Sequence, residues 1–318
     1  MTEQAQLESV LTLLADGKPH LLPPMSAQQR AEVLQQLKVW GLTVERLEDQ
    51  IYQLSEPLNL LDQSAINRTL AYGTALVLRS VDSTNEFLLQ HKTLPSGTIC
   101  TAEMQTAGRG RRGRQWHSPF AQNLYFSLLW HFRQSAERLQ ALSLVVGICL
   151  ADTLSELGVA NISIKWPNDI YLDGRKLGGI LIESRAFAAQ KQELVIGIGL
   201  NLSMRQADGV AIEQAWANLN ESAVRIERNQ LVATLANNLQ HVLLQVEQHG
   251  VAPYLQRWRQ YDHFYQKPIK LLLPESELHG IGQGIDSDSG ELLLQTADGQ
   301  LQRFHIGEIS VRPLPAQT

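Results

Sequence analysis

AEMQTAGRGRRGRQW, residues 102–116, ends in a run where three glycines and four arginines alternate before a tryptophan. Glycine lets the backbone approach a ligand closely, and neighbouring side chains in an extended loop point to opposite sides. Two of the arginines could therefore face a ligand while the other two face solvent. Arginine forks suit small phosphates as well as nucleic-acid backbones. The run by itself leaves open a nucleic-acid contact, a solvated basic tract and an anion-binding loop.

The segment lies within a long region, 65–268, that mixes strand and helix patterns. Helical spacing predicts helices over 138–157 and 229–249. Several predicted strands follow one another with no helix between them, which predicts an α/β region with a largely antiparallel or mixed sheet. The predicted strands are 75–81, 97–103, 124–130, 162–166, 178–184 and 194–202.

The two flanks have different patterns. Residues 1–63 predict a small unit with helices over 4–16 and 26–40, then a hairpin, and 55–63 is the expected linker. Residues 269–318 contain short apolar runs separated by the turn signals "DSDSG" and "ADGQ". We expect this C-terminal part to be a small β-barrel-like module.

The charge of the chain is unevenly distributed. The formal net charge is −5. Residues 1–63 hold four basic side chains against nine acidic ones, which gives the same −5, so the remainder is balanced. A chain that grips nucleic acid over its main surface normally leans basic. The arginines of 108–114 are therefore a local concentration in a neutral region.

Composition excludes several classes of protein. With 44% hydrophobic and 19% charged residues, the chain is neither disordered nor a collagen or coiled coil. Cys100 and Cys149 lie in apolar segments without metal-ligand spacing, as expected of buried thiols in a reducing cytosol. The polar N-terminus does not resemble a signal peptide, and the apolar run 139–151 is too short to span a bilayer. We expect a soluble cytoplasmic protein with no membrane contact.

Three further segments carry polar side chains next to predicted strands. "VDSTNEFL" (81–88) can begin a helix and present hydroxyls and free N–H groups. "KWPNDIYL" (165–172) follows a strand, and Asn168 and Asp169 could coordinate Mg²⁺ or a ligand. In "RKLGGILIES" (175–184), Lys176 and two glycines lead into a buried strand.

The sequence contains no Walker A segment, no nucleophile elbow and no Cys/His metal cluster. What remains is a set of arginines, lysines, glycines and amides. These groups supply positive charge but no nucleophile. Such a set suits a reaction at phosphorus, where positioning and electrostatics dominate.

Taken together, these segments resemble the biotin–protein ligases of the bacterial BirA type. The resemblance covers roughly 65–315, and the other matching segments are "DSTN", "NLYFSLLW", "KWPNDIY", "KLGGILIE" and "GIGLN". It implies an α+β fold: a mixed-sheet, class II synthetase-like catalytic domain (65–268). A winged helix–turn–helix-like unit (1–63) would precede this domain, and an SH3-like β-barrel (269–318) would follow it.

The resemblance also implies an activity. Biotin's carboxylate would attack the α-phosphate of Mg·ATP to give biotinyl-5′-AMP and pyrophosphate. A lysine of the biotin carboxyl carrier protein of acetyl-CoA carboxylase would then take the biotin. The glycine–arginine loop would close over biotin and its adenylate, so it would hold a small ligand.

The implied site residues fall into groups. The catalytic residues would be Arg111, Lys165 and Lys176. Biotin would contact Ser83, Thr84, Asn85, Gln105, Arg109, Gly110, Arg111, Lys176, Gly179 and Gly197. ATP and the adenylate would contact Arg109, Arg111, Arg114, Trp116, Asn168, Lys176, Asn201 and Trp216, with Asn168 also a candidate Mg²⁺ contact. Arg112 and Arg114 are expected to face outward, and Glu308 and Arg312 would complete the ATP and carrier sites.

The N-terminal unit departs from the family pattern. The space between His20 and Trp40 is too short for two full helices, and the wing position "ERLEDQIY" has three acids, one arginine and no glycine. Operator binding is therefore doubtful. The alternatives that stay open are a bifunctional ligase that also represses biotin synthesis genes and a metabolite-sensing transcription factor. Strands 178–184 and 194–202 are expected to offer a sheet edge for a weak homodimer.

Overall fold

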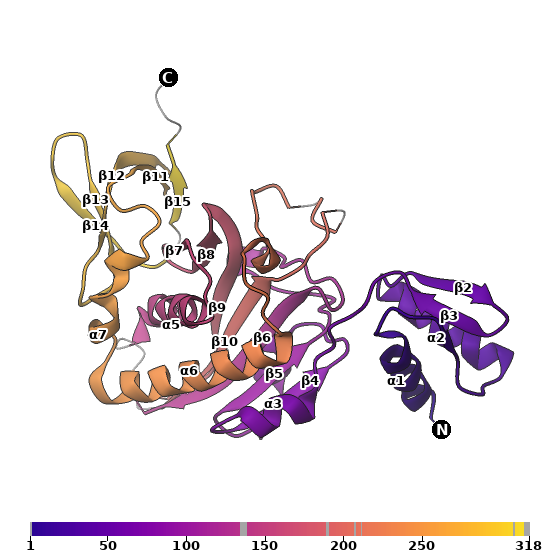
Figure 1. The fold of residues 1–318 in the computed structure, drawn as a ribbon. Helices are drawn as coiled ribbons and strands as arrows, with labels where there is room; N and C mark the ends of the chain where they lie inside the picture. Colours follow the sequence, from indigo (N-terminus) through magenta and orange to yellow (C-terminus); the bar gives the residue numbers. More distant parts are fainter. Residues whose placement is uncertain are drawn as a thin grey trace.

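The protein forms three units along the chain in the computed structural model (Figure 1). The structure describes residues 2–133, 139–188, 191–206, 208–210, 212–307 and 309–314, with no side-chain description for 186–188 and 191. We refer to the part from α3 to the turn at Trp258–Gln260 as the middle unit. Among the described residues, no helix is both long and apolar enough to cross a membrane.

The N-terminal unit has two helices and a three-stranded sheet. Thr2 caps α1 (Glu3–Leu14), and Ser26 caps α2 (Ala27–Val39) through a capping box with Gln29. The sheet has the order β1-β3-β2, with β1 at His20–Leu21, β2 at Val44–Glu48 and β3 at Ile51–Leu54. As the sequence predicts, one helix occupies the space between His20 and Trp40.

A seven-stranded mixed sheet is the centre of the middle unit. Its order is β4-β5-β6-β10-β9-β8-β7, and only the β4–β5 pair is parallel. The predicted strands are all present. The strands are β4 (Thr74–Leu78), β5 (Thr98–Ala102), β6 (Asn123–Phe132), β7 (Ile162–Lys165), β8 (Asp169–Leu172), β9 (Arg175–Ala188) and β10 (Lys191–Asn201).

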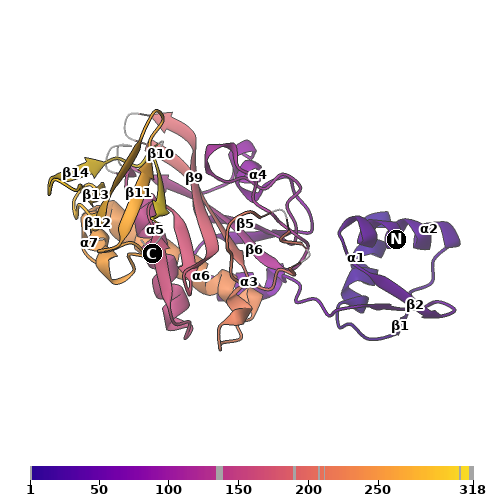
Figure 2. The same cartoon turned by 90° about the horizontal axis from the view of Figure 1, so that it is seen from above.

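One face of this sheet packs on the hydrophobic core, and the opposite face is more open. Side chains alternate along a strand, and Leu194, Ile196, Ile198 and Leu200 of β10 belong to the main hydrophobic core. The intervening positions include Gly197 and Gly199, which leave room on the opposite face. Helices α5 (Leu142–Glu156) and α6 (Arg228–His249) lie on the core side, and α4 (Thr84–Gln90) lies across the sheet from them (Figure 2).

Several helices agree with the sequence pattern and others were missed. The bounds of α5 and α6 lie close to the predicted ranges, and Ser83 caps α4 as the "DSTN" segment predicts. The sequence analysis missed α3 (Gln63–Thr69), α7 (Ala252–Leu255) and β8. These elements are at most seven residues long, so each offers little periodicity to read.

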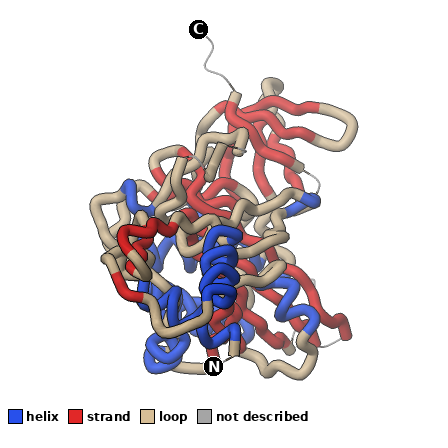
Figure 3. Tube along the Cα trace, turned by 90° about the vertical axis from the view of Figure 1, so that its right-hand side faces the viewer, coloured by secondary structure: helices blue, strands red, loops and turns tan. Residues whose placement is uncertain are grey.

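The C-terminal unit is a five-stranded antiparallel sheet at the end of the molecule that carries the C-terminus (Figure 3). Its order is β14-β13-β12-β11-β15. The strands are β11 (Pro268–Leu272), β12 (Glu277–Ile285), β13 (Leu292–Gln295), β14 (Leu301–Phe304) and β15 (Ser310–Pro313). The sequence analysis missed β12, in which three of the nine residues are glycines that weaken a strand pattern.

The expected dimerisation edge needs correction. Strand β10 lies between β6 and β9, so residues 194–202 are internal to the sheet and cannot offer an edge. Strand β9 is also internal at its start, where β8 pairs with it, but this pairing ends at Gly179. The outer side of β9 beyond that residue is not covered by β8.

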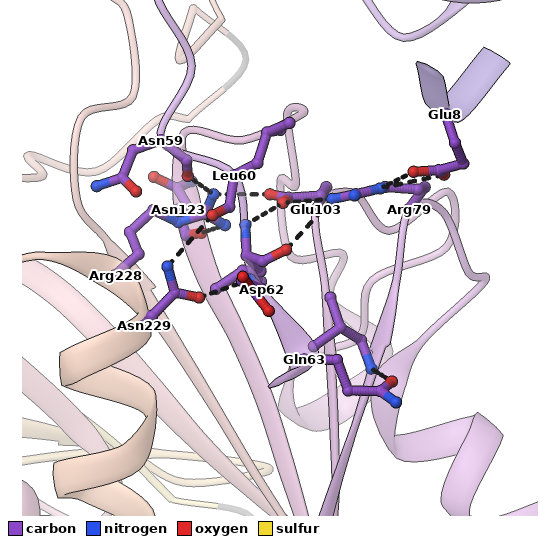
Figure 4. Close-up of polar contacts among 12 residues, drawn as sticks. Glu8, Asn59, Leu60, Asp62, Gln63, Arg79, Glu103, Asn123, Arg228 and Asn229 are labelled. Atoms are coloured by element: carbon purple, nitrogen blue, oxygen red, sulfur yellow. Dashed lines mark hydrogen bonds and ion pairs between the residues drawn. The ribbon is translucent and has the colours of Figure 1, made fainter. Parts of the chain in front are cut away.

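Buried charges tie the linker to both neighbouring units (Figure 4). Glu103, fully buried at the end of β5, accepts hydrogen bonds from Arg228 at 2.6 Å, from the Leu61 amide at 2.6 Å and from Arg79 at 3.3 Å. Arg79 also contacts Glu8 of α1 at 3.0 Å. A chain of alternating charges therefore connects the N-terminal unit, the linker and α6.

Candidate active site

A cavity of about 590 Å³ opens on the face of the middle sheet that carries α4. Its walls come from the glycine–arginine loop, the turn before β8, the starts of β9 and α4, the middle of β10, residues 212–216 and β15. The following predicted site residues all line this one cavity: Ser83, Thr84, Asn85, Gln105, Arg109, Gly110, Arg111, Arg114, Trp116, Lys165, Asn168, Lys176, Gly179, Gly197, Asn201 and Trp216.

A larger, open groove of about 1290 Å³ lies elsewhere, between the N-terminal unit and β4. It is lined by α1, α2, the linker and residues 77–80, and none of the predicted site residues reaches it. The polar groups that the sequence analysis singled out therefore converge on the smaller cavity.

Hydroxyl and amide groups form the floor of the cavity at the start of α4. The Thr84 amide and hydroxyl both donate to Gln105 Oε1, at 2.9 and 3.1 Å, and Gln105 donates to Ser118 at 3.1 Å. Ser127 of β6 is fully buried beneath them and lies 2.8 Å from Thr84 Oγ1 and 2.6 Å from Asn85 Oδ1. The floor is thus a connected polar network inside an otherwise apolar sheet.

Two glycines of β10 are required by close contacts on this face. A Cβ atom at position 197 would lie 2.3 Å from Asn85 Oδ1, and one at position 199 would lie 2.6 Å from the Trp116 ring. Neither distance is compatible with a side chain. Asn85 and Trp116 can therefore lie directly against the sheet.

The glycine–arginine loop is not fully extended, contrary to the sequence prediction. Residues Arg111–Gly113 form a short 3₁₀ turn, in which Arg112 has a left-handed backbone with φ of 59°. A left-handed residue reverses the chain direction over a short distance. Arg109 and Arg111 are half-buried and Arg112 and Arg114 are exposed, but all four line the cavity, so the expectation that Arg112 and Arg114 face outward is not met.

Both inward arginines are bound to groups of the protein. The two Nη atoms of Arg109 contact Glu86 at 2.8 Å and Glu183 at 3.0 Å. Arg111 donates to Asn168 Oδ1 at 2.9 Å and to the Gly307 carbonyl at 3.2 Å. Burial lowers the pKa of the Arg111 guanidinium. The loop is thereby tied to α4, to β9, to the turn before β8 and to the C-terminal unit.

Two lysines share one carboxylate at the centre of the cavity. Lys176 Nζ lies 2.9 Å from Asp169 Oδ1, and Lys165 Nζ lies 3.8 Å from Asp169 Oδ2. Lys165 is buried, and burial lowers its pKa to about 8 against the opposing effect of Asp169. With two ammonium groups and one carboxylate, this part of the cavity favours an anionic ligand.

Aromatic side chains flank these charges. Lys176 Nζ lies 5.7 Å from the centre of the Trp116 ring, and the Trp116 indole N–H is buried without a hydrogen-bond partner. Trp216 lies in a segment that pairs with β9 at Lys176, and Asn201 donates to the Ala217 carbonyl at 3.3 Å. The cavity therefore has a flat apolar wall beside its cationic centre.

The residues present do not fit a resident Mg²⁺ ion. Asn168, the predicted contact, uses Oδ1 to accept from Arg111 and Nδ2 to donate to the Ile180 carbonyl. The neighbouring carboxylate of Asp169 is paired with the two lysines. No group of three or more His, Cys, Asp or Glu side chains suited to a metal occurs in the part of the chain that the structure describes.

The sequence analysis missed three residues of this site. Asp169 was noted beside Asn168 but was not counted as a site residue, although it contacts both lysines. Ser127 and Glu183 lie within the matching segments "NLYFSLLW" and "KLGGILIE" but were not singled out, and their strand phase places them on the cavity side. Arg312 of β15 also lines the cavity, whereas Glu308 falls outside the described residues.

Comparison with known proteins gives two matches to family models. Residues 77–201 match the biotin/lipoate A/B protein ligase family, and residues 266–312 match the biotin protein ligase C-terminal domain. Together these two segments include most of the cavity, from the start of α4 to β15.

Similar curated proteins cover nearly the whole chain. The bifunctional ligase/repressor BirA of Salmonella typhimurium is 42% identical over 96% of this chain and 97% of its own length. The protein of that name from Escherichia coli is 41% identical over 95% and 96%. Among solved structures, a biotin protein ligase from Aquifex aeolicus in complex with biotin and ATP has a TM-score of 0.65 and 28% identity. That match covers 76% of this chain and 99% of the Aquifex chain.

Proposed function

Since this chain belongs to the biotin/lipoate A/B protein ligase family and is a biotin–protein ligase, we propose that its cavity binds biotin beside ATP and retains biotinyl-5′-AMP. The observation that carries this assignment to the cavity is the convergence of Lys165, Lys176 and Arg111 on the turn at Asn168 and Asp169. The other predicted contacts that the structure describes line the same cavity.

In the first step, a carboxylate oxygen of biotin attacks the α-phosphorus of Mg·ATP. A new P–O bond forms, and the bond to the β-phosphate breaks as pyrophosphate leaves with its electron pair. Two anions have to approach each other, so the barrier contains a large repulsive contribution. The proposed task of Lys165, Lys176 and Arg111 is to hold both anions and to stabilise the charge that develops on the phosphate. Mg²⁺ would arrive with the nucleotide, because Asn168 and Asp169, the predicted contact and its neighbour, already bind other groups of the protein.

In the second step, the ε-amine of a lysine on the biotin carboxyl carrier protein attacks the acyl carbon. A C–N bond forms, the C–O bond to AMP breaks, and the amine loses one proton. The mixed anhydride is sensitive to water between the two steps, so closure of the glycine–arginine loop would protect it. The contacts of Arg109 and Arg111 with three other parts of the unit support this closing role.

A direct assay tests the assignment. We expect the chain to transfer biotin to a biotin carboxyl carrier domain in the presence of Mg·ATP, detected with streptavidin, and to release pyrophosphate when the carrier is absent. A carrier whose acceptor lysine is replaced by arginine is the matched control. Failure to label the native carrier, with both substrates saturating, would refute the proposed function. We propose the cytoplasm as the site of the reaction, because it needs ATP and the carrier protein.

We also propose a weak homodimer that the adenylate strengthens. The outer side of β9 beyond Gly179 is free of β8 and can accept a strand from a second copy. Sedimentation velocity with and without biotin and ATP measures this, and a monomer at high concentration with the adenylate bound would contradict it.

The relatives from Salmonella typhimurium and Escherichia coli are named ligase/repressors, which raises operator binding as a second function. We propose that this chain lacks it. A helix–turn–helix joins its helices by a turn of three or four residues, whereas residues 15–26, including β1, separate α1 from α2 here. The negative charge of residues 1–63 supports the same conclusion.

A further inference from the structure

Glu183 links the floor of the cavity to the glycine–arginine loop, although it belongs to neither. It lies on β9, and a single oxygen, Oε2, accepts from Asn85 Nδ2 at 2.8 Å and from Arg109 Nη2 at 3.0 Å. Its side chain is 27% exposed. The inference that follows rests on the proposed function of the cavity.

On the floor side, Glu183 fixes which way the Asn85 amide points. A carboxylate and a backbone carbonyl can only accept hydrogen bonds. The Asn85 NH₂ group therefore has to face Glu183 Oε2 and the Leu181 carbonyl, which lies 3.2 Å away. Asn85 Oδ1 is then left to accept from Ser127 at 2.6 Å.

This orientation sets the polarity of the floor. Thr84 donates its hydroxyl proton to Gln105, so Ser127 has one proton for two acceptors, Thr84 Oγ1 and Asn85 Oδ1. The acceptor that Ser127 does not serve is left available to an N–H donor of a ligand. If the Asn85 amide turned over, an N–H group would replace that acceptor.

On the loop side, Glu183 and Glu86 together occupy the terminal nitrogens of Arg109. Its Nε is buried and has no hydrogen-bond partner among the described residues. Because two carboxylates already compensate its charge, the guanidinium holds the loop to β9 and α4 and is less suited than Arg111 to binding a phosphate. Arg109 thus differs in task from Arg111, despite their shared motif.

We propose that Glu183 is a positioning residue of the ligase. By accepting hydrogen bonds from Asn85 and Arg109 on one carboxylate oxygen, it fixes the orientation of the Asn85 amide in the cavity floor and keeps the closed loop in place beside it. It touches neither biotin nor ATP in this proposal. Removal of its charge should therefore impair biotin binding and adenylate retention together, while the chemical step in a saturated enzyme changes little.

The test compares three full-length single variants, in each of which the new side chain is similar in size to the native one. Glu183→Gln removes the shared charge. Glu86→Gln weakens only the contact with the loop, since the Glu86 carboxylate pairs with Arg109 and Gln90, whereas the Asn85 amide donates to Glu183. Asp152→Asn is the matched control, because its carboxylate is 24% exposed, is held by Arg257 and Tyr261 and lies outside the cavity. Each variant is measured for KM of biotin, kcat of pyrophosphate release, and the rate at which preformed biotinyl-5′-AMP is lost, with a thermal melt to establish folding.

We expect Glu183→Gln to raise both the KM for biotin and the adenylate loss rate about tenfold or more, as for loss of a charge-assisted hydrogen bond, with kcat within about threefold. Glu86→Gln should raise the loss rate with little change in KM, and Asp152→Asn should change neither. Arg109→Gln added to Glu183→Gln should raise the loss rate further by no more than Glu86→Gln does alone, because only the contact of Arg109 with Glu86 is then left to lose.

Two results would overturn the inference. One is native values for KM and adenylate loss in Glu183→Gln. The other is an equal change in Asp152→Asn, which would mean general loosening of the fold. If the unmodified chain forms no adenylate, the proposed function fails and this inference fails with it. The two failures are therefore distinguishable in one experiment.

Discussion

Lys176 Nζ lies 2.9 Å from Asp169 Oδ1, so the lysine proposed to receive biotin's carboxylate is already held by a carboxylate of the protein. The pair is largely buried, with side-chain exposures of 14% and 16%. An arriving anion would meet an ammonium group whose position is fixed in advance, which is how preorganised electrostatic stabilisation works.

Lys176→Ala should therefore depress pyrophosphate release from saturating biotin and Mg·ATP by roughly tenfold or more, the usual cost of losing a charge-assisted hydrogen bond. Lys176→Arg should rescue poorly, because the guanidinium is larger than the ammonium that lies between Asp169 and Trp116 and has a different, planar shape. Near-normal release by the alanine variant would remove Lys176 from the mechanism.

The charge of Lys165 should make adenylate formation depend on pH. Burial lowers its pKa to about 8, so the ammonium form dominates at pH 7 and is lost as the pH rises through 8. If the charged form is required, kcat/KM for adenylate formation should fall between about pH 7 and 9, as for an essential acid of the free enzyme. The carrier is left out of the assay, so that its own lysine does not contribute.

Lys165→Arg is the matched variant for this prediction, since a guanidinium stays charged throughout that range. We expect this variant to have a lower kcat/KM for adenylate formation, which no longer falls between about pH 7 and 9. A flat profile for the native enzyme between pH 7 and 9 would show that the charge of Lys165 does not matter.

Arg111→Ala should lose biotinyl-5′-AMP faster, by about ten- to a hundredfold, because a charge-assisted contact is worth roughly 1.5–3 kcal/mol. Its guanidinium also ties the loop to Asn168 and to the Gly307 carbonyl. Arg112→Gly is the comparison: it removes an exposed charge of the same loop from the cavity wall and suits the left-handed backbone there. If both variants retain the adenylate like the parent, Arg111 does not hold the phosphate.

Some features of the fold and of the site could be predicted from the sequence, and others could not. Local signals sufficed for the cap at Ser83, for α6 and for the strands that carry the motifs, because each depends on residues within one or two turns. The ion pair between Glu103 and Arg228 joins residues 125 positions apart in the sequence, so no local sequence pattern predicts it. The bridging role of Asp169 and Glu183 is likewise a property of how strands meet in the sheet.

Glu103→Gln tests that long-range link. It leaves Arg228, whose side chain is 5% exposed, without a full counter-charge, and breaking one partner of a buried ion pair costs about 3–5 kcal/mol. We expect the free energy of unfolding to fall by that amount in urea titrations followed by circular dichroism. Glu8→Gln removes the more exposed end of the same chain and should cost about 1 kcal/mol or less. Equal effects of the two variants would contradict this account.

The N-terminal unit should bind operator DNA weakly or not at all. Phosphate contacts by lysine and arginine supply much of the affinity of DNA-binding proteins, and residues 1–63 have four such side chains and a charge of −5. Its β2–β3 hairpin carries Glu45, Glu48 and Asp49, so the element at the wing position would repel the backbone. A dimer would double this repulsion together with the few contacts.

The unit instead packs on its neighbour: Trp40 stacks on Phe120 of the middle unit, with ring centroids 4.7 Å apart. A gel shift with DNA from upstream of the organism's biotin synthesis genes, at physiological salt with biotin and ATP present, decides the matter. We expect only weak binding that competitor DNA removes and that falls steeply with salt, as non-specific contacts do. A tight band that survives unrelated competitor DNA would show that a few well-placed basic residues outweigh the net charge.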